Sequence, residues 1–374
     1  MSSTWGKQIK LSIFGESHSK GIGVVIDGIP AGTKISFSEL LRFMQRRSSR
    51  GGQLDTPRIE QDFPQIQCGF LPDSENPDLL IACGTPVCAV IANSNTRSQD
   101  YNKLSDTARP GHADYTGFVR YHGCNDPRGG GHFSGRLTAP LCFAGGIAKQ
   151  ILRSYRIEIG AHISRVGSVA DEPLAPVSVD SKTLISLQQS FFPVLNQTAG
   201  EEMQQLISAA KERQDSLGGI IECVAVGLPA GIGDPIFDGI ENKIASLVFG
   251  IPAVKGLEFG LGFGFSSRCG SQTNDPFCIR DNKVQTSSNH NGGILGGITD
   301  GMPVLFRVAI KPTPSISQKQ KTVNFKTNTE TELVITGRHD PCIVRRAVPC
   351  VESAAALALL DSLLEHPFPT EEIQ

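Results

Sequence analysis

The sequence predicts an α+β protein in which antiparallel strands and helices form separate layers. Segments with an alternating or β-branched pattern are interspersed with helical ones, without the regular strand–helix–strand alternation of a doubly wound parallel sheet. Gly-Ile-Pro-Ala-Gly at residues 28–32 is echoed by Gly-Leu-Pro-Ala-Gly at 227–231, each after a strand-like run. The echo indicates a duplicated half, although such a segment also makes a turn in unrelated settings. The 40 glycines, 23 prolines and 39% hydrophobic residues fit a large core with many tight turns.

The elements follow from local patterns. Strands are expected at residues 7–14, 21–27, 87–94, 156–166, 219–226, 257–265, 303–311 and 332–336. Helices are expected at residues 37–47, 137–154, 181–192, 200–217, 239–249 and 351–365. The first helix has a clear start signal, because Ser36 and Glu39 have the spacing of a capping box. The polar segments 167–180 and 312–331 are expected to be surface connections.

Charge and apolar run length argue against two classes of protein. The 35 Lys and Arg residues nearly balance 37 Asp and Glu, so no bulk positive field attracts a nucleic acid. The longest apolar stretches, such as residues 354–360, fall short of the roughly 20 residues that span a bilayer, and no membrane partner is expected. The ten cysteines are dispersed without a Cys-x-x-Cys pair, which favours reduced thiols and a cytoplasmic location.

Five of the eight histidines stand in loop-like contexts beside glycine, arginine or a carboxylate. They are His18, His112, His132, His290 and His339. Any one of them taken alone is more often structural, but several in similar loops favour acid–base chemistry. Neither HxxxH nor HExxH spacing occurs, so we expect no catalytic metal.

Arginines and glycine-rich loops together predict a site for an anionic small molecule. Arg46 and Arg47 are explained by the dipole at the end of the first helix, but Arg50 and Arg58 lie in the loop beyond it. Further arginines accompany the histidines, at positions 109, 136 and 338. Glycine or hydroxyl residues are concentrated in loops 129–136, 291–297 and 311–315, which fit a phosphorylated cofactor, although neither a P-loop nor a GxGxxG motif is found.

Five motifs in register resemble those of the chorismate synthase family. They are Gly-Glu-Ser-His at 15–18, Arg-Pro-Gly-His-Ala-Asp at 109–114, Ser-Gly-Arg at 134–136, Pro-Ala-Val-Lys-Gly at 252–256 and Gly-Arg-His-Asp-Pro at 337–341. The resemblance implies a carbon–oxygen lyase of the shikimate pathway. It would remove phosphate and a ring proton from 5-enolpyruvylshikimate-3-phosphate by anti-1,4 elimination, with reduced flavin mononucleotide (FMN) as cofactor, and so make chorismate for aromatic amino-acid biosynthesis.

The resemblance also implies a fold and an assembly. A helical layer is expected between two antiparallel sheets, in one domain spanning residues 1–374. An internal pseudo-twofold would relate duplicated halves near 1–165 and 166–374, and four chains would form a homotetramer.

The resemblance assigns roles to individual residues. His18 would protonate the leaving phosphate, His112 would protonate or stabilise the reduced flavin near N1, and Asp340 would assist proton removal through flavin N5. Substrate binding is expected from Ser17, Arg47, Arg109, Arg136 and Arg338. Flavin binding is expected from His132, Phe133, Ser134, Pro252, Ala253, Gly296, Lys311, Pro312, Thr313, Pro314, Ser315 and Arg338.

Two departures from the family pattern and two other functions stay open. The arginine loop continues as Ser-Ser-Arg-Gly-Gly-Gln at 48–53, which leaves the roles of Arg50 and Arg58 undecided, and His132-Phe133 stands where many members have Arg-Ser. The alternative enzyme is a flavin oxidoreductase acting on an anionic substrate. An anion-binding or RNA-binding protein that uses the arginine loop is less favoured, because few aromatic residues could stack on bases and the net charge of -2 gives no attractive field. The chain length favours an external flavin reductant, and use of NADPH by the chain itself is left open.

Overall fold

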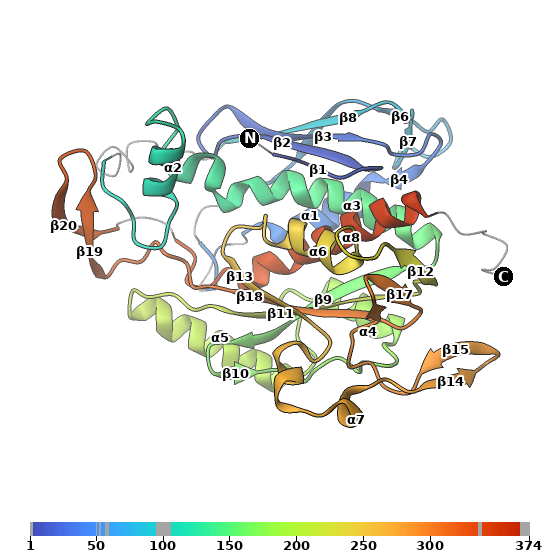
Figure 1. Cartoon of the computed structure of the whole chain (residues 1–374). Coiled ribbons are helices and arrows are strands. Elements are labelled where there is room, and N and C mark those ends of the chain that lie inside the picture. Colours follow the sequence, from blue (N-terminus) through green and yellow to red (C-terminus); the bar gives the residue numbers. More distant parts are fainter. Residues whose placement is uncertain are drawn as a thin grey trace.

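Two five-stranded antiparallel sheets lie on opposite sides of a layer of helices (Figure 1). The computed structural model of the chain describes residues 3–49, 51, 54–56, 60–94, 106–335 and 339–366. The layered α+β architecture predicted from the sequence is therefore confirmed.

The first sheet is built by the N-terminal part of the chain. Its strand order is β1 (Thr4–Trp5), β2 (Lys10–Gly15), β3 (Gly21–Asp27), β8 (Val87–Ala92), β5 (Pro64–Cys68). A smaller sheet beside it has the order β4 (Lys34–Ser36), β7 (Leu79–Ala82), β6 (Phe70–Pro72). Ile22, Val24 and Ile26 alternate along β3 and are buried, so they face α1 (Phe37–Arg47) and α3 (Thr138–Ser154) in the helical layer.

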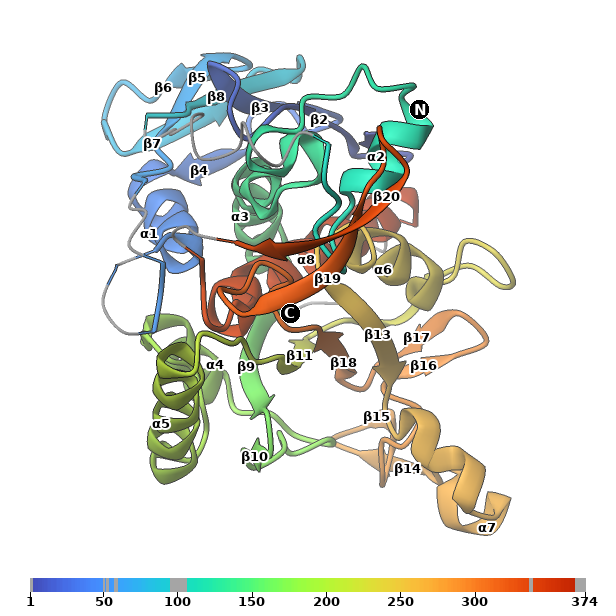
Figure 2. The same ribbon diagram turned by 90° about the vertical axis from the view of Figure 1, so that its left-hand side faces the viewer.

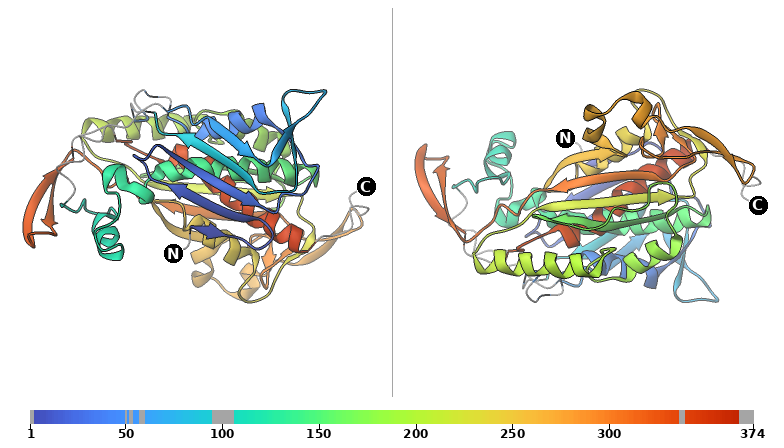
Figure 3. Two further views of the ribbon diagram at one scale, coloured as in Figure 1. Left: turned by 90° about the horizontal axis from the view of Figure 1, so that it is seen from above. Right: turned by 90° about the horizontal axis from the view of Figure 1, so that it is seen from below.

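The second sheet has the order β10 (Val169–Ala170), β9 (Glu158–Val166), β11 (Gly219–Val226), β18 (Val304–Ile310), β13 (Val254–Phe259). Its companion small sheet is β12 (Ala230–Gly233), β17 (Ile298–Asp300), β16 (Ile294–Leu295). The helices α6 (Ile240–Val248) and α8 (Val344–Glu365) cover the inner face, whereas α4 (Ser181–Gln189) and α5 (Gln197–Glu212) lie on the outer side (Figure 3).

The two halves of the chain connect their elements in the same order. In the first half β2, β3, β4, α1, β5, β6, β7, β8 and α3 follow one another; the second half repeats this with β9, β11, β12, α6, β13, β16, β17, β18 and α8. The echoed Gly-x-Pro-Ala-Gly segment follows β3 in the first half and β11 in the second. The repeated order begins at β9, so the second unit starts at or before Glu158, ahead of the division at residues 165 and 166 expected from the sequence.

The longest helix, α8, runs through the middle of the core. It is long and apolar enough to cross a membrane, but 94% of its apolar 18-residue segment is buried inside the protein, as in the core helix of a folded domain. Its one glutamate in mid-helix, Glu352, is fully buried and accepts hydrogen bonds from Arg46 on α1 and Lys149 on α3. The buried carboxylate thus joins three helices of the central layer.

Several elements differ from their predicted form. α8 begins at Val344 rather than at residue 351, because the helix continues through Pro349. The strand expected at 257–265 ends at Phe259 and is followed by a 3-10 turn, η4 (Gly262–Ser267). The expected surface connection at 312–331 contains most of a hairpin, β19 (Lys319–Asn324) and β20 (Thr329–Val334). Short elements that were not predicted include α2 (Asp114–Arg120), η2 (Arg128–Phe133), η3 (Gly135–Leu137), α7 (Gly270–Thr273), β14 (Phe277–Arg280) and β15 (Lys283–Thr286).

The segments inserted before the two long helices pack on each other. α2 lies between β8 and α3, and the β19–β20 hairpin lies between β18 and α8, which are equivalent places in the two halves. Phe325 at the hairpin turn contacts Phe118 of α2, with ring centroids 4.7 Å apart and the rings tilted by 42°. Figure 2 shows α2 and the β19–β20 hairpin next to each other. This contact brings loops from both halves to one end of the molecule.

Candidate active site

A cavity of about 760 Å³ is lined by segments from both halves of the chain. This volume lies in the upper part of the range for small-molecule and cofactor sites, roughly 300–1,000 Å³. The lining residues fall within the ranges 47–60, 109–116, 129–138, 249–255, 311–315 and 339–350.

The lining is strongly cationic. Among the residues that the structure describes, the charged side chains on it are Arg47, Arg109, Arg136, Lys255, Lys311 and Arg346, against the two carboxylates of Glu60 and Asp340. Since the chain as a whole has a net charge of -2, this excess is a local property of the cavity. Such a lining favours a ligand with several negative charges.

A turn of three glycines separates the two histidines predicted to be catalytic. Gly129, Gly130 and Gly131 all have positive φ, of 61°, 86° and 54°. A Cβ atom on Gly129 would lie 2.2 Å from the His18 ring, and one on Gly130 would lie 3.0 Å from the His112 ring. Only glycine therefore fits between the two imidazoles. His112 lines the cavity, whereas His18 is buried behind Gly129.

Asp114 holds both Arg109 and His112. Its carboxylate accepts hydrogen bonds from Arg109 Nε at 2.8 Å and Nη2 at 2.7 Å, and lies 2.8 Å from His112 Nδ1. Burial alone would raise the pKa of the Asp114 carboxyl, but hydrogen bonds from Arg109 and His112 lower it well below its ordinary value. Asp114 is therefore ionised and orients the imidazole of His112 at the edge of the cavity.

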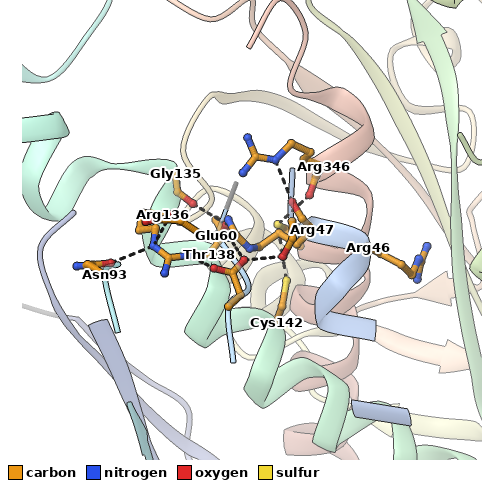
Figure 4. Close-up of polar contacts among 12 residues, drawn as sticks. Arg46, Arg47, Glu60, Asn93, Gly135, Arg136, Thr138, Cys142 and Arg346 are labelled. Atoms are coloured by element: carbon orange, nitrogen blue, oxygen red, sulfur yellow. Dashed lines mark hydrogen bonds and ion pairs between the residues drawn. The ribbon is translucent and has the colours of Figure 1, made fainter. Parts of the chain in front are cut away.

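Asp62 bridges the two arginines Arg47 and Arg136. Each guanidinium donates a hydrogen bond to one oxygen of this buried carboxylate. Burial would raise the pKa of Asp62, but Arg47 and Arg136 lower it well below its ordinary value. Figure 4 shows Arg136 between Asn93, which accepts from its Nε at 3.0 Å, and Glu60 at 3.1 Å. Arg47 and Arg136, two of the four arginines predicted to bind the substrate, are thus fixed by carboxylates of the chain.

Asp340 and His339 line the cavity and lie just before α8 in the sequence. Asp340 accepts a hydrogen bond from the Thr56 backbone at 2.8 Å and pairs with Arg346 at 2.5 Å. Burial lowers the pKa of His339, and the positive charge of Arg109 lowers it further. His339 is therefore neutral at physiological pH and can accept or donate one hydrogen bond into the cavity.

The loops expected to bind the flavin form a further part of the lining. Lys311, Thr313, Pro314 and Ser315 line the cavity together with Pro252 and Ala253. Burial and the nearby charge of Lys255 lower the pKa of Lys311. Two lysines and two hydroxyl residues on this wall resemble the donors that bind a phosphate group.

Other predicted flavin contacts are engaged within the chain or lie elsewhere. His132 lines the cavity, but its Nδ1 bonds to the Gly15 carbonyl at 2.8 Å and its Nε2 to Ser3 Oγ at 2.9 Å. The Ser134 side chain caps η3 by accepting from the Arg136 backbone. Phe133 lines the cavity, whereas Pro312 and Gly296 are not among its lining residues; Gly296 lies between β16 and β17.

Arg338, predicted for both substrate and flavin, lies outside the described residues, as do Arg50 and Arg58. Ser17 is fully buried beside Gly129, and its Oγ has no hydrogen-bond partner within the described part of the chain.

Buried polar atoms at the cavity are left without partners. Within the ranges that the structure describes, no hydrogen bond is made by Thr313 Oγ1, His339 Nε2 or Arg47 Nε. Because buried polar groups in folded proteins are almost always satisfied, these atoms indicate a polar ligand at this site.

Five charged residues at or beside the cavity were not predicted as site residues: Glu60, Asp62, Asp114, Lys255 and Arg346. Asp62 gives no local signal, because its partners are 15 and 74 residues away along the chain. Arg346 is on the first turn of α8, which the sequence pattern placed beyond Pro349. Asp114 lies in the motif at 109–114, and Lys255 lies in the motif at 252–256. Their charges, next to His112 and to the loop at 252–254, could have identified them as site residues.

A cluster of Asp234, Glu365 and His366 brings ligand-type atoms within 4.8 Å of one another, but it does not line the cavity. Glu365 is paired with Lys7 and Lys243, and Asp234 bonds to His366 at 3.0 Å. The three residues therefore form a group of ion pairs near the surface.

Comparison with known proteins decides the family. The family model described as chorismate synthase matches residues 9–364. The chain belongs to the chorismate synthase family. The chorismate synthase of Lancefieldella parvula is 45% identical over 377 residues, covering 98% of this chain and 97% of the relative. That of Pyrococcus abyssi is 46% identical, covering 96% and 97%.

A solved structure gives the same result for the fold. The crystal structure of a chorismate synthase aligns with a TM-score of 0.72 at 27% identity, covering 96% of this chain and 93% of the other. Membership of the chorismate synthase family makes the chain a lyase of the shikimate pathway, as the sequence motifs predicted.

Proposed function

We propose that the chain converts 5-enolpyruvylshikimate-3-phosphate to chorismate with reduced FMN as cofactor. The observation that carries the proposal is the cavity with six cationic side chains, which has His112 and Asp340 on its lining and His18 behind one glycine. Its charge matches a substrate with two carboxylates and a phosphate.

The residues present fit a flavin mononucleotide. Lys255 and Lys311 with the hydroxyls of Thr313 and Ser315 would hold its phosphate, and the unpartnered Thr313 Oγ1 supports this placement. When bound, the reduced flavin would supply electron density to the substrate ring during loss of phosphate, without net oxidation.

The side chains of the chain divide the remaining work. Arg47 and Arg136 would bind anionic groups of the substrate in place of part of their contact with Asp62. His18 would donate a proton to the departing phosphate, and Asp340 would assist removal of the ring proton. Arg109, whose Nε and Nη2 are taken by Asp114, would act mainly by fixing His112.

The proposal includes a homotetramer, an external flavin reductant and a cytoplasmic location. Support for assembly comes from the β14–β15 hairpin, where Phe277, Ile279 and Val284 expose 65%, 70% and 61% of their surface. Ile279 pairs directly with Val284, and Phe277 is two residues along the same strand, so all three share one face. A two-stranded ribbon with an uncovered apolar face is better stabilised by a neighbouring chain.

Anaerobic incubation of the purified chain with reduced FMN and 5-enolpyruvylshikimate-3-phosphate tests the proposal. We expect chorismate and inorganic phosphate to appear together. Folded protein that binds flavin but forms no chorismate would contradict the proposal.

A further inference from the structure

Two cysteines meet at the wall of the cavity. Cys142 on α3 and Cys350 on α8 are 208 residues apart in sequence, yet their sulfur atoms are 3.8 Å apart. Cys142 is fully buried, and Cys350, only 2% exposed, lines the cavity. Figure 4 shows Cys142 close to Arg47 and Thr138. A small molecule that enters the cavity can therefore reach one thiol, and the second lies directly behind it.

The surroundings activate the thiol that faces the cavity. The Cys142 S–H donates to Cys350, and this hydrogen bond, with the nearby Arg47 guanidinium, lowers the pKa of Cys350. Burial raises the pKa of Cys142, which keeps its proton. Cys350 donates its own S–H to the Arg346 carbonyl at 3.4 Å, and a thiol whose pKa is lowered by a second thiol and an arginine loses its proton more readily than an ordinary buried cysteine.

The other buried cysteines lack this combination. Cys223 and Cys342 do not line the cavity, and burial raises the pKa of each. Cys269 is exposed at the start of α7, where any oxidant in solution can reach it. These three residues provide internal references for reactivity at Cys350.

We propose that Cys142 and Cys350 form a peroxide-sensitive dithiol that opens to the cavity. The Cys350 thiol loses its proton to solvent, its sulfur attacks one oxygen of a hydroperoxide, and the O–O bond breaks; Cys350 becomes a sulfenic acid, and the hydroxide or alkoxide that leaves takes up a proton from solvent. The Cys142 thiol then attacks the Cys350 sulfur, and its proton leaves with the displaced hydroxide as water, so that a disulfide forms. The two thiols are oxidised by two electrons and the peroxide is reduced by two.

The geometry allows this bond with small movements. A disulfide is about 2.05 Å long, so the sulfurs must approach by less than about 2 Å. The bond would link the two long helices that occupy equivalent places in the two halves, next to Arg47, which also donates to Thr138 Oγ1 at 3.4 Å. Oxidation would thus alter the wall that holds a predicted substrate-binding arginine.

Peptide mapping of the intact folded chain tests the proposal. The protein is treated with dilute hydrogen peroxide, alkylated without reductant and digested with trypsin, which separates the two cysteines by cleaving after Arg136, Lys149 and Arg346. We expect a cross-linked Cys142–Cys350 peptide that dithiothreitol releases. Cys142→Ser should abolish the cross-link and leave a sulfenic acid at Cys350 that dimedone traps.

Matched variants and references separate this result from general oxidation. Cys223→Ser should retain the cross-link, because Cys223 lies outside the cavity. Oxidation of Cys269 shows that the peroxide dose was effective, and an unchanged circular dichroism spectrum shows that each variant is folded. Recovery of both Cys142 and Cys350 as free thiols at a dose that oxidises Cys269 would overturn the proposal, as would a cross-link that forms only after unfolding.

Discussion

One carboxylate, Asp114, fixes two of the residues on which the proposed chemistry depends. It is bound by the guanidinium of Arg109 and lies beside His112 Nδ1, and these hydrogen bonds keep it ionised. A change at Asp114 therefore affects the orientation of His112 without removing any group that faces the ligand.

Asp114→Asn should lower kcat by about tenfold or more, as expected when a general acid–base group loses its orientation. The asparagine amide presents a donor where the carboxylate accepted, so one of its two partners loses its hydrogen bond. Steady-state kinetics should show the loss in kcat, with KM for FMN nearly unchanged. Asp238→Asn is the matched control, because Asp238 pairs with Lys7 at the surface. Equal effects of the two substitutions would contradict a positioning role for Asp114.

A second buried histidine, His162, controls stability rather than chemistry. It is fully buried on β9, with Nδ1 2.9 Å from Asp171 and Nε2 3.0 Å from Glu222. Burial would lower the pKa of His162, but the hydrogen bonds that its ring donates to the carboxylates of Asp171 and Glu222 raise it above its ordinary value. The charged imidazole therefore ties β9 to β11 and to the loop after β10.

The raised pKa of His162 sets the sign of a pH effect on stability. The stabilisation is complete below the ordinary histidine pKa of about 6.5 and is lost as the pH rises through the higher value in the folded state. In urea unfolding, the wild type should have a higher free energy of unfolding than His162→Gln at about pH 6, and this difference should shrink as the pH rises to about 9. His122→Asn, at an exposed turn, should follow the wild type. Parallel pH curves for wild type and His162→Gln would contradict this account.

At the scale of elements, the glycine turn at 129–131 places His18 and His112 on either side of one backbone segment. Gly129→Ala puts a methyl group at positive φ and against the His18 ring. We expect turnover to fall by about 10²-fold, the scale of lost general acid–base catalysis. Gly264→Ala is the control, because its Cβ meets only Leu261 at 3.9 Å. Full activity of Gly129→Ala would remove the turn from the mechanism.

Most long elements could be predicted from the sequence, because their apolar periodicity is local. The helix at Phe37–Arg47 was located by Ser36, whose side chain caps Glu39 as expected, although Glu39 itself pairs with Arg153 instead of closing the capping box. The first turns of α8 were missed because Pro349 resembles a helix boundary. The β19–β20 hairpin is rich in charged and polar residues. It packs through Phe325 at its turn, which contacts Phe118 of α2, and no local pattern reveals this contact.

For the whole molecule, loops distant in sequence meet only through the repeated fold. Sequence motifs pointed to His112, Arg136, Asp340 and Lys311, which all line one cavity. Asp62, which holds Arg47 and Arg136, and the contact of Cys142 with Cys350 depend on tertiary distance and gave no sequence signal.

The proposed homotetramer can be tested by its mass. A homotetramer has a mass of about 160 kDa, four times the 40.1 kDa chain. Light scattering coupled to gel filtration should give this mass for the wild type. Ile279→Asp places a charge on the exposed apolar face of the β14–β15 hairpin and should give smaller species. Lys283→Asp, on the same hairpin, is the control at a polar position. A monomeric wild type would contradict the proposed assembly.

The stoichiometry of turnover with catalytic FMN and no oxygen distinguishes the lyase reaction from a redox reaction. An elimination without net oxidation predicts one chorismate and one phosphate for each substrate consumed, while the reductant is used only to reduce the flavin at the start. Consumption of one reductant per product, or product without phosphate release, would contradict the lyase reaction and favour a flavin oxidoreductase.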